Sequence, residues 1–416
     1  MVNQTTKTIN QMKAIKVNYL VLLLILLSFS AFSQSVKQDV EFLASDKLEG
    51  REIGTKGEIE AAKYVAKRFK KVGLIPKGTE GFYQKFSVKP KYNPHALVKA
   101  DTSKHIEGRN VIGYLDNKSA TTIVIGAHFD HLGYGGEGSL SGDSAIHNGA
   151  DDNASGVAIM LQLADWLKGK YTHNNYLFIA FSGEEKGLWG SNWFTKHPTL
   201  DLATVNYMLN MDMVGRLDAE RKLAVYGTGT SPVWKEVLDD IASNNDIHMI
   251  AKESGVGPSD HTSFYLTDLP VLHLFTGQHQ DYHKPSDDAD KINYDGMKVV
   301  QQFVTDIIAK VDDKGKIEFT KTKEDESQKA PSYSVTLGVI PDYMFEGPGM
   351  RIDGVRDDKP AQKAGMQKGD VVIKVDDHEV ADMMGYMKVL GMYKKGELAH
   401  VVIKRGEEEL TLEVTW

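Results

Sequence analysis

The stretch Thr121–Asp130 reads Thr-Thr-Ile-Val-Ile-Gly-Ala-His-Phe-Asp, an apolar run that ends in a histidine and an aspartate. Its β-branched residues favour extended backbone, so we predict a buried strand over 121–125 followed by a loop. Further along, apolar residues recur at helical spacing, namely Val157, Met160, Leu161, Ala164 and Leu167. A strand, a loop and a helix in this order form the repeating unit of an α/β fold.

The same alternation continues on both sides of this unit. Strands are predicted over Tyr176–Phe181, Val205–Met211, Leu223–Tyr226 and Val271–Phe275. Residues 35–75 are predicted to be helical, with apolar residues from Ile59 to Val72 on one face and Gly73 as the C-cap, and further helices are predicted after the N-cap pair Ser231-Pro232 and from Met297 to Ile308. We therefore predict an α/β fold in which helices flank a mixed, mostly parallel sheet.

The composition changes near residue 312. The stretch 312–332 is dense in Lys, Glu and Asp and poor in apolar residues, which is typical of a linker. Beyond it, the alternation of Val371, Ile373 and Val375 and a final strand pair over 399–404 and 409–414 indicate a small β-rich domain. We predict a larger domain over 34–311, a charged linker over 312–332 and a β-rich domain over 333–416.

The N-terminus carries the pattern of an export signal. Lys13 and Lys16 precede an apolar run over 19–27, and small residues near Ser33 follow it. A membrane anchor is the alternative, but a spanning helix needs ~20 apolar residues. We therefore expect residues 1–33 to be a signal peptide and the protein to be exported, to the periplasm or the extracellular space. We expect no integral membrane segment in the mature chain.

Composition limits the chemistry open to the chain. Its 416 residues carry a formal net charge of -8, which argues against a nucleic-acid partner because phosphate binding needs a clustered positive surface. The sequence contains no cysteine, which excludes disulfides, cysteine zinc ligands and a cysteine nucleophile. Any metal must therefore be held by His, Asp and Glu.

Residues of these three types gather at the ends of predicted strands and at the start of a helix. The segments are Gly126–His131, Gly149–Gly156, Ser182–Glu185 and Asn210–Asp212, and Asp281–Asp287 adds a histidine from a later loop. The carboxyl ends of strands in an open α/β sheet share one crevice, so these loops should converge. Each segment alone is weak evidence, but their recurrence at strand ends predicts a metal site.

In their residues and in their order along the chain, these segments resemble the bacterial leucyl-type aminopeptidase family of two-zinc peptidases, relatives of glutamate carboxypeptidase and glutaminyl cyclase. The resemblance covers about residues 42–310, and the stretch Leu43–Arg51 is similar to the family's N-terminal region. It implies a metallo-exopeptidase, a hydrolase that removes N-terminal residues from peptides. The alternatives are a glutaminyl cyclase, which in this fold works with a single zinc, a carboxypeptidase for acidic peptides, and a non-catalytic scaffold.

Matched position by position, the resemblance implies a role for individual residues. His128 and Asp212 would hold one zinc ion, Glu185 and His283 would hold the other, and Asp152 would bridge the pair. Glu184 would be the general base, Asp130 the carboxylate behind His128, and Tyr282 a residue that helps to hold the tetrahedral oxyanion.

Physical chemistry supports this set of residue types independently. Neutral imidazole and carboxylate oxygen are ligands that zinc accepts. Three carboxylates and one hydroxide would cancel the charge of two zinc ions, so a neutral site could form in a partly buried crevice. Metal ions about 3.5–4 Å apart can activate a water between them. Adjacent Glu184 and Glu185 point in different directions on extended backbone, so one can bind metal while the other moves a proton.

Other residues near these segments have less specific expectations. We expect hydrogen-bonding or pocket-lining roles for His131, His147 and His261. His261 follows Ser259-Asp260, a pair similar to one near the family's substrate pocket. Trp189 follows the two glutamates and is expected either to line a pocket or to pack.

The C-terminal domain resembles bacterial PDZ domains over about residues 333–416. The matching segments are Leu337-Gly338-Val339, Pro360-Ala361, Ala364-Gly365 and Gly369–Ile373. The resemblance implies that Leu337–Val339 forms a carboxylate-binding loop and that the domain captures chain ends by strand addition. The alternative is a module that only packs on the larger domain or mediates dimerisation.

Overall fold

The structure is a computed structural model that describes residues 36–89, 105–136, 138–141, 144–322, 335–342, 345, 347–355 and 359–416. The predicted signal peptide over residues 1–33 lies outside these ranges. Within the described part of the chain, no helix combines the length and the apolar character needed to span a membrane.

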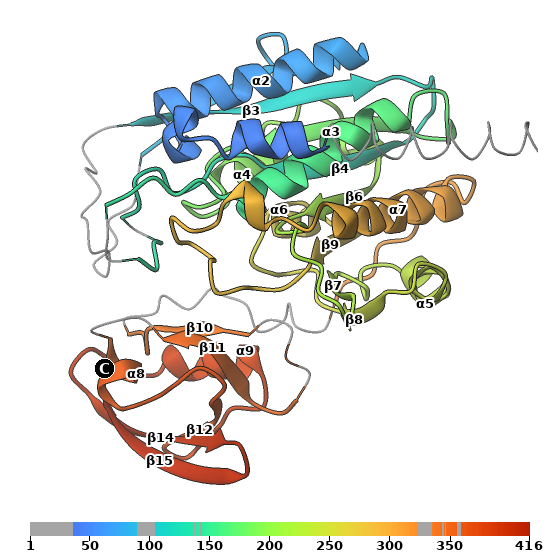
Figure 1. The fold of residues 1–416 in the computed structure, drawn as a ribbon. Helices are drawn as coiled ribbons and strands as arrows, with labels where there is room; N and C mark the ends of the chain where they lie inside the picture. The colour runs from blue at the N-terminus through green and yellow to red at the C-terminus, as the bar shows by residue number, and fades with distance from the viewer. Residues whose placement is uncertain are drawn as a thin grey trace, which may run out of the picture.

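A nine-stranded mixed sheet forms the centre of the larger domain, with the order β1-β3-β5-β4-β6-β9-β7-β8 and with β2 paired to β3 (Figure 1). The strands are β1 (Ile75–Pro76), β2 (Tyr83–Val88), β3 (Ile106–Leu115), β4 (Thr122–His128), β5 (Asn175–Phe181), β6 (Val205–Met211), β7 (Lys222–Tyr226), β8 (His248–Lys252) and β9 (Val271–Phe275). The central strands β5, β4, β6 and β9 pair in parallel, whereas β3 and β7 pair antiparallel to β5 and β9. The predicted mixed sheet is confirmed, with its parallel pairings concentrated at the centre.

The central strands are buried on both faces. Every residue of β4, β5, β6 and β9 is buried, as their apolar and β-branched composition predicts for parallel strands. Gly126 permits close packing inside the sheet, because a Cβ there would lie 2.6 Å from the Phe181 ring and 2.8 Å from Met208 Cε. β4 continues beyond the predicted end at residue 125 and places His128 at its carboxyl end.

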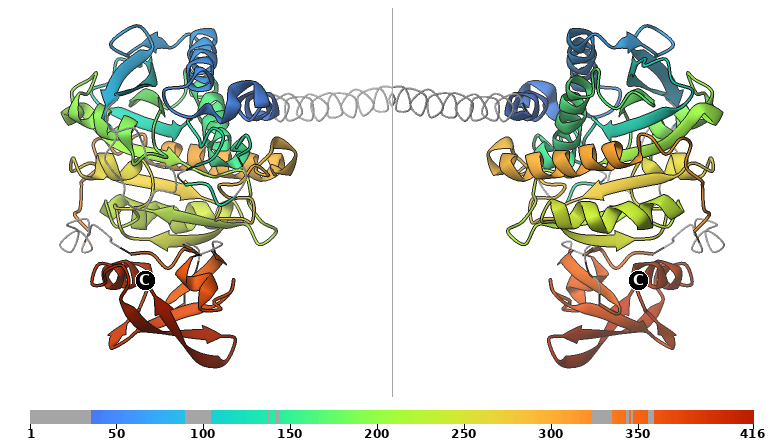
Figure 2. Two further views of the ribbon diagram at one scale, coloured as in Figure 1. Left: turned by 90° about the vertical axis from the view of Figure 1, so that its left-hand side faces the viewer. Right: turned by 90° about the vertical axis from the view of Figure 1, so that its right-hand side faces the viewer.

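Helices cover both faces of the sheet (Figure 2). They are α2 (Lys56–Val72), α3 (Gly156–Trp166), α4 (Trp189–Lys196), α5 (Pro232–Asn244), α6 (His261–Tyr265) and α7 (Tyr294–Val311). Ile123 and Ile125 of β4 belong to the core that includes α2, α3, α5 and α7. Val124, between them in sequence, packs on the other face with Phe194 of α4 and Phe264 of α6. The layers therefore follow from the alternation of side chains along each strand.

The stretch 35–75, predicted to be helical, is divided into a helical segment over residues 36–43, a short helix over Asp46–Arg51 and α2, and local capping interactions mark the ends of α2 and the start of α5. The Thr55 side chain accepts a hydrogen bond from the Glu58 N–H at the start of α2, and Gly73 ends this helix at φ 89°. At the start of α5, the Ser231 side chain accepts a hydrogen bond from the Val233 N–H, and a proline occupies the first turn. Short-range sequence signals thus decide where these helices begin and end.

The C-terminal domain has its own antiparallel six-stranded sheet, with the order β10-β11-β12-β14-β15 and with β13 paired to β12. Its elements are β10 (Val339–Pro341), β11 (Met350–Val355), α8 (Pro360–Lys363), β12 (Val371–Val375), β13 (His378–Glu379), α9 (Met383–Leu390), β14 (Leu398–Arg405) and β15 (Glu408–Thr415). Leu337, Val372, Val401 and Trp416 belong to a hydrophobic core that is separate from the cores of the larger domain. The predicted final strand pair corresponds to β14 and β15.

The described part of the predicted linker lies against the larger domain. The Ile317 N–H donates to Asn206 Oδ1 at 2.8 Å, and Ile317 is buried. The Thr322 N–H donates to the Tyr265 hydroxyl at 2.9 Å, and Thr322 is also buried. Residues 316–322 therefore contribute to packing on the larger domain, while the exact domain boundaries stay a prediction.

Candidate metal centre

The candidate ligands come from the carboxyl ends of neighbouring parallel strands. His128 is the last residue of β4, Glu184 and Glu185 follow β5, and Asp212 follows β6. Asp152 lies in a short helical turn, η2 (Ala150–Ser155), between β4 and α3, and its peptide bond to the next residue is cis. Since β4 pairs with both β5 and β6, the sheet brings the three strand ends to one place, as the sequence predicts.

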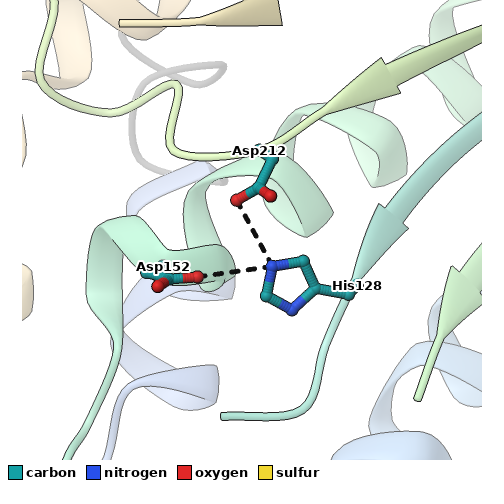
Figure 3. A group of neighbouring side chains, drawn as sticks. All are labelled: His128, Asp152 and Asp212. Atoms are coloured by element: carbon teal, nitrogen blue, oxygen red, sulfur yellow. Dashed lines mark hydrogen bonds and ion pairs between the residues drawn. The ribbon is translucent and has the colours of Figure 1, made fainter. Parts of the chain in front are cut away.

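One group of ligand atoms surrounds the His128 imidazole. Its Nε2 lies 3.3 Å from Asp152 Oδ1 and 3.3 Å from Asp212 Oδ1 (Figure 3). Zinc bonds to nitrogen and oxygen are about 2.0–2.2 Å long, and in a tetrahedral site such bonds put neighbouring ligand atoms roughly 3.3–3.5 Å apart. The donor types and their separations therefore fit a zinc ion.

A second group uses the other oxygen of Asp152. His283 Nε2 lies 3.1 Å from Asp152 Oδ2 and 3.3 Å from Glu185 Oε2. His131 approaches from the other side, with its Nδ1 2.7 Å from Glu185 Oε1 and 3.9 Å from Asp152 Oδ2. The separations around His283 again match neighbouring zinc ligands, whereas the contact between His131 and Glu185 has the length of a hydrogen bond.

Sequence reasoning left His131 between hydrogen bonding and pocket lining, and the structure shows the hydrogen bond. His147 is likewise hydrogen-bonded, with Nε2 2.8 Å from Ser139 Oγ and Nδ1 2.8 Å from Ala145 O. His261 is buried and stacks on His273 with ring centroids 4.4 Å apart. The position of His131, three residues after His128 in the same loop, was the one signal that could have suggested its contact.

Asp130 lies close to both His128 and the backbone of the glutamate pair. Its Oδ1 accepts a hydrogen bond from the Glu184 N–H at 3.1 Å and lies 3.8 Å from His128 Nδ1. The nearer acceptor for His128 Nδ1 is the main-chain carbonyl of Asp130, at 3.3 Å. The Asp130 carboxylate is therefore behind His128 as expected, and it also orients the backbone of the glutamate pair.

A cavity of about 360 Å³ opens on these residues. Its wall includes the carboxylates and His283 and, on the apolar side, Leu188, Met213, Phe275 and Tyr282. Tyr282 stacks on the His283 ring with centroids 3.8 Å apart. An extended molecule could therefore place a polar bond at the carboxylates and an apolar group against the other wall.

Comparison with known proteins gives this arrangement a family. The model of peptidase family M28 matches residues 110–308, and the model of the PDZ domain matches residues 317–415. The chain carries an M28 peptidase domain followed by a PDZ domain. The predicted family, fold class and enzyme class, a metallo-exopeptidase, are confirmed by these matches and by the relatives below.

The relatives of the M28 domain include aminopeptidases. The Bacillus subtilis protein "Aminopeptidase YwaD" is 26% identical over 225 residues, which are 50% of this chain and 46% of that protein. A solved zinc aminopeptidase from Bacillus subtilis, BSAP, superposes with a TM-score of 0.55 at 18% identity and covers 69% of this chain and 95% of its own. A glutaminyl cyclase from Bacteroides thetaiotaomicron has a TM-score of 0.53 at 18% identity, with 66% and 97% covered.

The sequence and structural similarities support different conclusions. The chain spans about half the length of most of the curated relatives that it matches. The structural similarities, at under 25% identity, show a shared fold and are common to an aminopeptidase and a cyclase. The residue roles in this chain therefore depend on its own geometry.

In the M28 domain, the pKa values of the adjacent Glu184 and Glu185 are shifted in opposite directions. Burial raises the pKa of Glu184 well above its usual range, and the carboxylates of Asp212 and Glu185 add to this effect against the opposing influence of His128. Burial alone would also raise the pKa of Glu185, but His283 and His131 hold it down at about 2. The two carboxyl groups therefore lie in different electrostatic environments, one that disfavours the charged form of Glu184 and one in which two histidines favour the charged form of Glu185.

Because Asp152 belongs to both groups, its loss should affect metal binding differently from the loss of His128. We expect Asp152→Ala to weaken the binding of both zinc ions, whereas His128→Ala should weaken mainly one. Metal content by mass spectrometry and a competitive zinc titration of both variants check this expectation. His173→Ala, at an exposed histidine outside the site, is the control and should bind zinc as the unaltered protein does. Two independent, undisturbed sites in Asp152→Ala would contradict the bridge.

Proposed function

We propose that this protein is an exported, zinc-dependent aminopeptidase that hydrolyses N-terminal residues from peptides. Two zinc ions would be held by His128 and Asp212, and by Glu185 and His283, with Asp152 between them. The observation that carries the proposal is that the two oxygens of Asp152 face two separate histidine–carboxylate groups. Among the described residues, two groups that share Asp152 have ligand atoms within 4.8 Å of one another, His128 with Asp152 and Asp212, and His131 with Asp152 and Glu185. His283 joins the second group through Nε2, which lies 3.1 Å from Asp152 Oδ2 and 3.3 Å from Glu185 Oε2.

The chain's own residues would divide the work of peptide hydrolysis. Bound zinc would supply Lewis-acid polarisation of the scissile carbonyl and of the attacking water. The Glu184 carboxylate would accept a proton from that water and return it to the nitrogen of the leaving amine. Tyr282, on the cavity wall, would donate a hydrogen bond to the carbonyl oxygen as negative charge develops there. Asp130 would hold the Glu184 backbone in place.

The cavity also supports a preference for the first side chain of the substrate. Leu188, Met213 and Phe275 form an apolar wall beside the carboxylates. Burying an apolar side chain there is favourable by roughly 1.5–3 kcal/mol, whereas a charged side chain would lose its hydration against these apolar residues. We therefore favour substrates with an apolar N-terminal residue.

Two separate histidine-bearing groups favour the aminopeptidase over a glutaminyl cyclase and over a non-catalytic scaffold. A cyclase that works with a single zinc has no need of both His128 and His283, and a non-catalytic scaffold has no need of either group. Glu184 lines the cavity beside both groups, where its carboxylate is placed for proton transfer, which favours an enzyme over a scaffold.

We also infer that the PDZ domain takes up a chain end along β10. β10 is the last strand on its side of the sheet, so the described residues leave one edge without a partner strand. Leu337 is buried in the core, and Gly338 has φ 74°. A turn of this kind before an edge strand presents backbone N–H groups that can receive a carboxylate while the peptide adds as a strand.

Removal of the proton acceptor should separate catalysis from metal binding. Glu184→Gln keeps the size of the side chain but cannot accept the proton, so turnover should fall by roughly 10²–10⁴-fold or more. Zinc content should stay near that of the unaltered protein, whereas the neighbouring variant Glu185→Gln should lose zinc. Steady-state kinetics and metal analysis of both variants are the measurement. Loss of zinc in Glu184→Gln would show that the two glutamates have exchanged roles.

Cleavage from the N-terminus is tested with pairs of substrates that have a free or a blocked α-amine. A panel of aminoacyl fluorophores should be hydrolysed fastest when the first residue is apolar, and the rates should vanish with a chelator and return with added zinc. N-acetylated versions of the best substrates should be cleaved poorly, because a free α-amine is part of the recognition. Equal rates on blocked and free peptides would point to an endopeptidase or a carboxypeptidase and would reject the assignment.

Truncation tests the separation of the domains. A chain ending at Thr322 keeps the contacts of Ile317 and Thr322, so it should bind zinc and cleave small aminoacyl substrates at a rate close to that of the full chain. It should show a higher KM for long peptides that end in a free carboxylate. A chain ending at Asp313 loses the burial of Ile317, worth about 1.5–3 kcal/mol, and should melt at a lower temperature. Unchanged kinetics on long peptides would leave the PDZ domain without a recognition role.

A further inference from the structure

The stretch Leu43–Arg51 resembles the family's N-terminal region, yet none of the proposed catalytic steps uses it. In the structure it leads from a helical segment over residues 36–43 into a short helix, η1 (Asp46–Arg51). Arg51 at its end is fully buried, with 0% exposure, and is one of the largest buried side chains in the protein. A buried guanidinium is costly unless its donors are satisfied, so its partners indicate its role.

The Arg51 side chain donates to main-chain carbonyls on both loops that carry candidate ligands. Its Nε donates to Phe129 O at 2.7 Å, in the loop after β4. Its Nη1 donates to Asn148 O at 2.5 Å and its Nη2 to Gly149 O at 3.0 Å, in the segment before η2. Nη1 also donates to Leu43 O, so both loops are tied to the N-terminal segment.

The backbone around Arg51 makes a second set of contacts with the same loop. The Arg51 carbonyl accepts a hydrogen bond from the His131 N–H at 3.4 Å, and the Gly50 carbonyl accepts one from the Gly133 N–H at 3.0 Å. Gly50 has φ 70°, and a Cβ there would lie 2.4 Å from Gly133 O. The turn is therefore pressed against the loop so closely that only glycine fits at this position.

The segment that carries Asp152 is also held from the opposite side. The Asp287 carboxylate accepts hydrogen bonds through Oδ2 from the N–H groups of Asp151, at 2.9 Å, and Asp152, at 3.1 Å. The Asp287 carbonyl accepts one from the Ala150 N–H at 3.0 Å. The carbonyls of residues 148 and 149 thus bind a cation, and the amides of residues 150–152 bind the acidic residue at position 287.

The electrostatics of Arg51 agree with this arrangement. Burial lowers the pKa of Arg51 to about 10, and the nearby carboxylates Asp130 and Asp152 oppose that fall. The guanidinium therefore keeps its charge at neutral pH. Its planar fork can reach several carbonyls on separate loops at once, which a lysine ammonium on a flexible stem does not reproduce.

We propose that Arg51 is a positioning residue for the metal centre. Its planar guanidinium group, with its fork of N–H donors, fixes the loop after β4 and the segment before Asp152 at the spacing that their ligands need. This inference rests on the proposed zinc site. Groups that hold metal ligands in place typically change metal affinity by 10–100-fold when they are lost. Arg51 acts through the backbone of the two loops and touches no reacting atom in the proposed chemistry.

The test compares zinc affinity with stability in the full-length protein. Arg51→Met removes the charge and the fork, and Arg51→Lys keeps the charge alone. Both should weaken zinc binding by roughly 10–100-fold in a chelator-competition titration, with the lysine variant regaining only a small part. The matched control is Arg68→Met, which removes another largely buried arginine. Arg68 lies on α2 and pairs with buried Asp39. The control variant should lower the melting temperature of the metal-free protein and leave zinc affinity within about twofold.

The outcomes are separable. If the Arg51 variants lose melting temperature as Arg68→Met does but keep their zinc affinity, Arg51 is merely structural and the inference fails. If Arg51→Lys binds zinc as tightly as the unaltered protein, charge rather than the fork is what the site needs, and the positioning role is overturned. Should Arg51→Met be insoluble, Arg51→Lys decides alone. If the unaltered protein binds no zinc in the same titration, the proposed function fails instead.

Discussion

The structure depends above all on holding several buried carboxylates close together. Asp130, Glu184, Glu185 and Asp212 lie at the carboxyl ends of three adjacent parallel strands, and Asp152 lies beside them in η2, all largely out of water. Buried carboxylates repel one another and lose hydration, so such a cluster is stable only with compensating cations and hydrogen-bond donors. Histidines, a buried arginine and backbone amides supply part of this compensation. The fold around the site can be understood as the means of presenting these donors, with metal ions completing the balance.

Much of the fold could be predicted because buried parallel strands have a distinctive composition. β6 and β9 begin and end where the apolar runs do, and β4 was underestimated only because Gly126 and His128 interrupt its pattern. The sequence analysis missed β1, β2, β3 and β8. β3 mixes Glu107, Gly108 and Arg109 with apolar residues, since this strand lies near the antiparallel side of the sheet, where Glu58 and Arg109 form an ion pair. The described part of the charged stretch after residue 312 was read as a linker because composition does not reveal the anchoring contacts of Ile317 and Thr322.

The candidate site was predictable to the extent that residue type reveals chemistry. Histidines and carboxylates at strand ends could be recognised, and the structure brings them together, although their individual roles stay predictions. The interactions that hold them could not be recognised in the same way. Arg51 and Asp287 act on carbonyl and amide groups, which every residue possesses, so no side-chain pattern in the loops marks them as partners. His131 was left between hydrogen bonding and pocket lining for a related reason, since its position in the loop does not reveal that it faces Glu185.

Because both ligand groups share the Asp152 carboxylate, the structural order of the loops and the charge balance of the site depend on each other. Asp152 faces His128 with one oxygen and His283 with the other, so a small rotation of its side chain would spoil both sets of separations. The backbone amides of Asp151 and Asp152 are fixed by Asp287, while the carbonyls just before them are fixed by Arg51. These contacts hold the backbone from which Asp152 projects, and none of them involves a metal ligand atom. Preorganisation of this kind would reduce the ordering that metal binding requires, and metal affinity would then depend on residues that never contact the metal.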